Sequence, residues 1–74
     1  MNRIRIYEFT KRELDYFRDR CNFTNEELEY FNLKAKNLTN VAVSLQMNIS
    51  ISKVSYIATK VVAKIRKVID EKGD

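Results

Sequence analysis

The chain is 74 residues long, carries a formal net charge of +4 and contains no histidine, no proline and a single cysteine. This length predicts one domain spanning residues 1–74. Without histidine the chain lacks the commonest general base and zinc ligand, and one cysteine cannot build a structural zinc site. We therefore expect no enzyme, no metal and no cofactor. No apolar run reaches the roughly 18 residues of a membrane span, and no signal peptide or disulfide is expected, so the interpretation is a cytoplasmic protein without a membrane partner.

The first residues alternate between polar and apolar side chains from Arg3 to Phe9. This alternation fits a short strand or an extended arm, although a lone strand has no partner within the chain. A second copy could pair with it, or the segment could pack back on the helices. We expect an extended arm over residues 1–9 and leave its packing open.

Two capping boxes predict the first two helices. Thr10 precedes Glu13, and Thr24 precedes Glu27, by the spacing at which each side chain binds the other residue's backbone N–H. An extra first helix is expected within residues 10–21. The acids at the start of the second helix suit the positive end of its dipole better than a catalytic pair. The apolar stripes of these two helices should be buried, and they comprise Leu14, Phe17, Cys21, Leu28, Tyr30, Phe31, Leu33 and Ala35.

A short capped helix, a tight turn and a longer helix follow. Asn37 should end the second helix, because asparagine tolerates the left-handed conformation of a helix exit. Thr39 then caps a third helix over about residues 40–46, residues 47–49 form the turn, and Ser50 caps the last helix. This is the layout of a helix-turn-helix, whose second helix enters the DNA major groove. The predicted fold is therefore all-α, a four-helix helix-turn-helix domain with a short N-terminal arm.

Residues placed about 100° apart divide the last helix into two faces. The face expected toward the core comprises Val54, Ile57, Ala58, Val61, Ile65 and Val68. The outer face near the N-terminal end comprises Ser52, Lys53, Ser55, Tyr56, Thr59 and Lys60. Its small polar side chains allow close approach to base edges, where lysine can donate to guanine and hydroxyls can serve either base. Such a face is often merely solvated, so the preceding cap, helix and turn are what favour DNA binding.

The matching residues from 23 to 65 keep one register without a gap: Phe23-Thr24, Glu27, Tyr30-Phe31, Ala35, Leu38-Thr39-Asn40, Val43-Ser44, Met47, Ile49-Ser50, Val54, Val61 and Ile65. The series resembles the helix-turn-helix of LuxR/GerE-type regulators and of sigma factor region 4. That resemblance implies a tri-helical DNA-binding core within residues 23–69, with the last helix as recognition helix. It also implies DNA contacts at Lys53, Ser55 and Tyr56. Lys53 and Ser55 replace the family's usual threonine and lysine, so no base preference is carried over.

We expect a sequence-specific transcriptional regulator, of phage or mobile-element origin, that binds double-stranded DNA. The expected DNA-binding residues are Ser52, Lys53, Ser55, Tyr56, Thr59, Lys60, Lys64 and Lys67. The last two lie further along the helix, where phosphates are the expected target. Two alternatives remain, an adaptor that docks onto RNA polymerase or another regulator, and a DNA-packaging or recombination accessory protein.

Two pairs of apolar residues need a cover. Val41 and Leu45 stand four apart and therefore share a helix face, which is usually polar in the resembled family. We expect the extra first helix to cover this pair; a partner protein or a second copy is the other reading. Val62 and Ile69 broaden the apolar stripe of the last helix and could form a homodimer contact or pack on the N-terminal segment.

Overall fold

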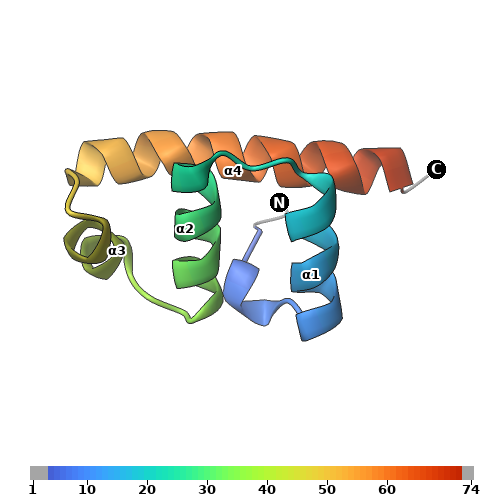
Figure 1. The fold of residues 1–74 in the computed structure, drawn as a ribbon, viewed down its shortest axis with the longest axis horizontal. Helices are drawn as coiled ribbons and strands as arrows, with labels where there is room; N and C mark the ends of the chain where they lie inside the picture. Colours follow the sequence, from blue (N-terminus) through green and yellow to red (C-terminus); the bar gives the residue numbers. More distant parts are fainter. Residues whose placement is uncertain (1–3, 73–74) are drawn as a thin grey trace.

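The computed structural model describes residues 4–72. This part of the chain is all-α and has no strand. It comprises a 3₁₀ turn and four α-helices: η1 (Ile6–Glu8), α1 (Lys11–Arg20), α2 (Asn25–Ala35), α3 (Asn40–Met47) and α4 (Ile51–Lys72). Helix α4 runs along the whole molecule, and the other three helices lie on one side of it (Figure 1). Along α4 from its N-terminal to its C-terminal end, these are α3, α2 and α1.

Both predicted capping boxes are confirmed. The Thr10 hydroxyl accepts the Glu13 backbone N–H at 3.1 Å, and the Glu13 carboxylate accepts the Thr10 N–H at 2.8 Å. At the start of α2 the same two hydrogen bonds join Thr24 and Glu27, at 3.2 and 3.0 Å. Each box satisfies two backbone N–H groups that the helix itself leaves without a partner, which fixes where α1 and α2 begin.

Asparagines form the helix exits. Within residues 4–72, the non-glycine residues with positive φ are Asn22, Asn37 and Asn48, at 53°, 64° and 59°. Asn48 stands in the predicted turn between α3 and α4. There the Ile49 N–H donates to the Ser44 carbonyl at 3.0 Å. The Ser50 hydroxyl then accepts the Lys53 N–H at 3.1 Å and so begins α4. These bonds separate α3 from α4 and give the predicted helix-turn-helix connection.

The core lies between α4 and the helices beneath it. Its fully buried side chains are Phe31, Val43, Val54, Val61 and Ile65. The predicted inner face of α4 is confirmed, with Ala58 half-buried and the other five residues buried. Because this core face extends from Val54 to Val68 of the 22-residue helix, α4 is held along most of its length and its opposite side is left open.

The prediction of an extended N-terminal arm is wrong at Ile6–Glu8, while Arg5 and Phe9 on either side keep extended backbone and residues 1–3 lie outside the described part. The alternative that this segment packs back on the helices is confirmed. The η1 turn folds this segment back, burying Ile6 and placing the Phe9 ring 4.9 Å from that of Phe17. A lone strand leaves its backbone groups without partners, whereas the turn buries an isoleucine against α2. Val62 lines a depression of about 290 Å³ together with Ile4 and other residues of this segment. It therefore lies beside the N-terminal segment, which was one of the two positions expected for it.

The prediction that the first helix covers Val41 and Leu45 is also wrong. Val41 and Leu45 are 55% and 76% exposed, and α1 does not lie over them. Helix α1 packs against the C-terminal half of α4, whereas α3 lies at the opposite end (Figure 1). The apolar residues of α1 are used there, since Phe17 and Cys21 are both buried. The exposed pair is therefore an apolar surface on α3 with no cover from within the described chain.

Candidate nucleic-acid interface

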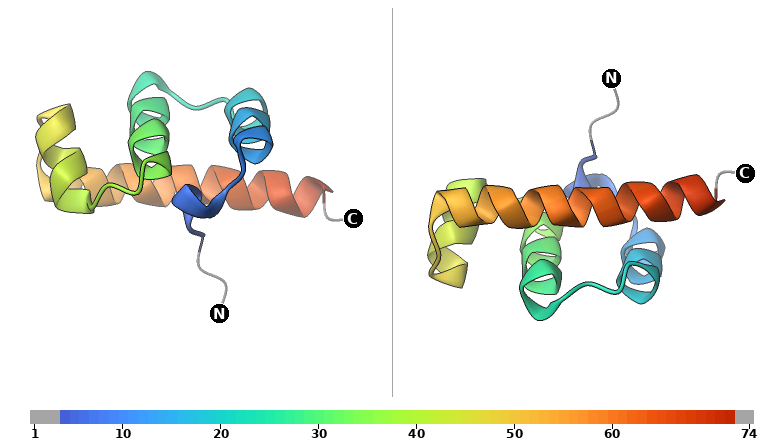
Figure 2. Two further views of the ribbon diagram at one scale, coloured as in Figure 1. Left: turned by 90° about the horizontal axis from the view of Figure 1, so that it is seen from below. Right: turned by 90° about the horizontal axis from the view of Figure 1, so that it is seen from above.

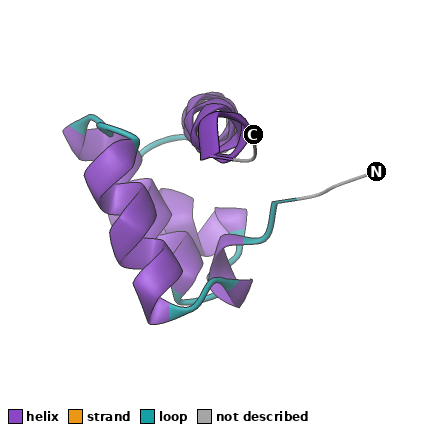
Figure 3. Ribbon diagram, turned by 90° about the vertical axis from the view of Figure 1, so that its right-hand side faces the viewer, coloured by secondary structure: helices purple, strands orange, loops and turns teal. Residues whose placement is uncertain are grey.

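The outer face of α4 stands open at its N-terminal half. All six predicted residues of this face are exposed: Ser52, Lys53, Ser55, Tyr56, Thr59 and Lys60. We call these six residues the reading face. Figure 2 (right) looks onto α4 from the side opposite the other helices, and no other helix crosses it there. The view along α4 in Figure 3 likewise shows the helix standing at one edge of the molecule. A helix exposed in this way is free to enter a DNA groove.

Tyr56 organises the basic side chains of the reading face. Its ring centroid lies 6.0 Å from the Lys53 ammonium and 5.2 Å from the Lys60 ammonium. Both distances lie within about 6 Å, the range of cation–π attraction. The two lysines stand three residues before and four residues after the tyrosine, so all three share one side of the helix. Two positive charges therefore flank one aromatic ring, an arrangement suited to a polyanion.

Lys53 has one partner on the neighbouring helix. Its ammonium lies 3.9 Å from the Glu26 carboxylate, and both side chains are about half exposed. Such exposed pairs contribute roughly 0–1 kcal/mol, because water competes for both charges. A phosphate oxygen can replace this carboxylate at small cost, so the ion pair does not remove Lys53 from the reading face.

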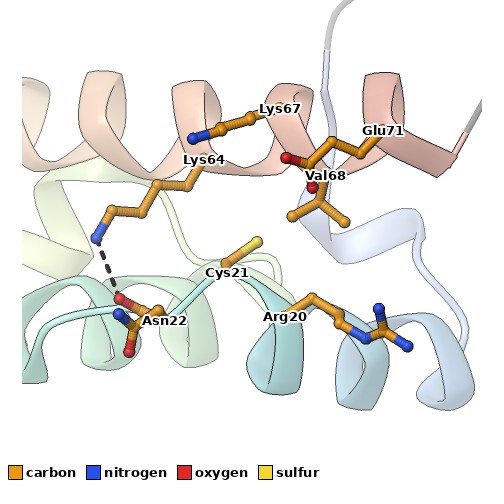
Figure 4. A pocket seen from close by; sticks show the side chains of 7 residues that line it. All are labelled: Arg20, Cys21, Asn22, Lys64, Lys67, Val68 and Glu71. Carbon is orange, nitrogen blue, oxygen red and sulfur yellow. Dashed lines mark hydrogen bonds between the residues drawn. The ribbon is translucent and has the colours of Figure 1, made fainter.

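Lys64 follows Lys60 by four residues on the same side of α4, but groups of the protein itself hold its ammonium. It forms an ion pair with Glu27. It also donates to the Asn22 backbone carbonyl at 3.2 Å (Figure 4). The structure therefore engages this expected phosphate-binding residue in contacts within the protein. Here it ties α4 to the start of α2 and to the α1–α2 loop. From the sequence, Glu27 is predicted only as a capping acid, because its partner lies on another helix.

The ion pair changes the titration of Glu27, whose residue is only 7% exposed. Burial acts to raise the pKa of this carboxyl. The hydrogen bonds from Lys64 and from the Thr24 backbone, together with the positive charges of Lys64 and Lys60, outweigh burial and hold the pKa below its ordinary value. The carboxylate thus stays ionised at neutral pH and keeps Lys64 engaged.

Lys67 is exposed and stands on the same side of α4 as Tyr56, but about three turns further along the helix. It lines a depression of about 310 Å³ between the C-terminal half of α4 and the end of α1, beside Lys64, Cys21 and Glu71 (Figure 4). At a helix rise of about 1.5 Å per residue, it stands about 16 Å beyond Tyr56. Cys21 at this depression is free and buried. Burial raises the pKa of its thiol, an effect that the nearby Lys64 charge partly opposes. A buried thiol of this kind is inert, so the depression offers no nucleophile.

One exposed aliphatic residue at the edge of the reading face is assigned to neither helix face by the sequence pattern. Ile51 is the first residue of α4 and is 50% exposed. It precedes Ser55 by four residues and therefore stands on the same side of the helix, one turn nearer its start. That spacing is the signal by which sequence reasoning could have included it.

Among the described residues, no group of three or more histidine, cysteine or acidic side chains could hold a metal ion. In the same residues, none of the helices is both long and apolar enough to span a bilayer. The reading face can supply hydroxyl and ammonium hydrogen bonds, positive charge and one aromatic ring.

Comparison of the chain with protein-family models, with curated proteins and with solved structures gave no match.

Proposed function

We propose that this protein is a sequence-specific DNA-binding transcriptional regulator that reads the major groove with the N-terminal half of α4. One observation carries the proposal. A left-handed turn at Asn48 and a serine cap lead into a helix whose core face is packed and whose opposite face is open, hydroxylated and basic. A helix after such a turn is the element that enters the groove in helix-turn-helix proteins.

Within the reading face, the expected roles differ. Ser52, Ser55 and Thr59 are short enough to bring the helix close to base edges, and their hydroxyls can serve either base. Lys53 can donate to guanine O6 and N7 from the first turn of α4. Lys60 and Tyr56 stand further from the tip, where phosphate oxygens are the nearer partners. Lys64 is left out of this set, because Glu27 and Asn22 already hold it.

The proposal is tested by selecting bound duplexes from a random pool while the salt concentration is varied. A sequence-specific reader enriches one defined site, whereas a protein held only by phosphates enriches none. The outcome that contradicts base reading is equal affinity for the enriched duplex and for random DNA at every salt concentration.

A second candidate function is supported by the exposed apolar residues on α3. Val41 and Leu45 form a surface of the kind that marks protein contacts, and an adaptor that docks onto RNA polymerase or another regulator would use it. Val41→Glu separates the two functions. It should abolish capture of RNA polymerase by an adaptor and leave DNA selection by a regulator unchanged, while the circular dichroism spectrum reports that the fold is intact.

A further inference from the structure

Ile51 is an aliphatic side chain that the core of the protein does not use. It opens α4 and is 50% exposed, while the buried face of the helix begins at Val54. Its neighbours on the exposed side are the hydroxyls of Ser52 and Ser55. The tip of α4 therefore combines small polar groups with a single apolar one.

If α4 reads DNA, this combination of polar and apolar side chains favours particular bases, so the inference rests on the proposed function. Reading helices of this kind present their first residues to the base edges. In the major groove, hydrogen-bonding groups occur on every base, but only thymine carries a methyl group. A serine hydroxyl can serve any base, whereas an isoleucine gains affinity only where apolar surface meets it.

We infer that Ile51 is a specificity-determining residue, which contacts the C5-methyl group of a thymine when α4 lies in the major groove. The bound site then contains a thymine opposite the tip of the helix, beside the bases that Ser52 and Lys53 contact. Ile51 acts through apolar contact alone, so its contribution is independent of salt. The lysines of the same face contribute through charge and lose strength as salt rises.

The same helix offers a matched control. Ile69 is also an exposed isoleucine of α4, at 44%, but it lies about 27 Å further along at a rise of about 1.5 Å per residue. A side chain at that distance cannot reach the base contacted by the tip. Ile69→Ala therefore removes the same amount of apolar side chain from the same helix without touching the proposed contact.

The experiment uses the duplex selected from the random pool, with each thymine replaced in turn by uracil. Uracil keeps every hydrogen-bonding group of thymine and lacks only the methyl group. For the wild-type protein, one replacement in the site should weaken binding about fourfold, the value of burying one methylene-sized group. Ile51→Ala should bind the thymine and uracil duplexes equally, and Ile69→Ala should keep the wild-type difference.

Three results overturn the inference while leaving DNA reading intact: a selected site without thymine, a wild-type protein indifferent to every uracil, or a uracil effect that survives in Ile51→Ala. If no site is selected at all, the proposed function fails and the inference fails with it. Circular dichroism of both variants reports whether α4 remains helical, and alanine at the exposed first turn of a helix favours that outcome.

Discussion

The two halves of α4 carry lysines at similar helical spacing but place them in different surroundings. In the N-terminal half, Lys53 and Lys60 stand in solvent around the Tyr56 ring. In the C-terminal half, Lys64 turns inward to a buried glutamate. The difference comes from the elements beneath each half. Lys64 forms an ion pair with the buried carboxylate of Glu27, whereas the carboxylate nearest Lys53 is that of the exposed Glu26. A basic stripe on a helix therefore identifies an interface only once the neighbouring helices are known.

The largest expected effect is on stability and is confined to the C-terminal half. Lys64→Met removes the partner of buried Glu27 and should lower the free energy of unfolding by about 2–3 kcal/mol. This loss is at or below the low end of the range for breaking a buried ion pair, because the Lys64 side chain is 33% exposed. Lys60→Met, the matched change on the reading face, should cost less than Lys64→Met, because the Lys60 charge is the smallest of the effects that lower the pKa of Glu27. Urea unfolding of both variants measures the difference, and equal stabilities would contradict the inward role of Lys64.

The next effect is on DNA binding and is confined to the N-terminal half. Lys53→Ala should cost about 2 kcal/mol on the selected site, because it removes a base contact, and less on random DNA. Fluorescence anisotropy with labelled duplexes measures both affinities. An equal loss on both duplexes would mean that Lys53 contacts phosphate rather than a base.

The pH dependence of stability should distinguish the buried carboxylate from the exposed ones. The folded pKa of Glu27 lies below its ordinary value near 4.5, so its contribution is complete above that value and is lost as pH falls through the folded pKa. Glu27→Gln should therefore cost about 1–2 kcal/mol at pH 7. The wild-type protein and Glu27→Gln should converge in stability as the pH falls below the ordinary pKa of a glutamate carboxyl. A difference that stays constant down to pH 2 would rule out the ion pair as its source.

The smallest effect is on the salt dependence of binding. Lys60→Ala should reduce the slope of log affinity against log salt by about 0.9, the value of one phosphate contact. Lys64, already held by Glu27, should leave the slope unchanged when replaced by methionine. If Lys64→Met flattens the slope and Lys60→Ala does not, the assignment of the two halves is reversed.

The sequence predicted what depends on residues close together in the chain. The capping boxes at Thr10 and Thr24, the exit at Asn37 and the turn before Ser50 are local signals, and each has its predicted hydrogen bond or backbone conformation. The two faces of α4 follow from helical spacing in the same way. The reading face could thus be named residue by residue from the sequence, although its use remains a proposal.

Prediction from the sequence failed where segments far apart in the chain come into contact. Lys64 and Glu27 stand 37 positions apart, so no local pattern joins them. The alternation before Thr10 suited a strand, but burial of Ile6 against α2 decided the conformation of that segment. The expected cover over Val41 failed for the same reason, because the sequence does not give the end of α4 at which α1 packs.

The central claim is that the N-terminal half of α4 is the part that meets DNA. Amide chemical-shift mapping of the full chain, on addition of the selected duplex at moderate salt, tests it most directly. We expect the largest changes over residues 50–60, with the amides of Val41 and Leu45 and of residues 64–71 little affected. Changes centred on α3, or spread evenly over every exposed lysine, would contradict the account.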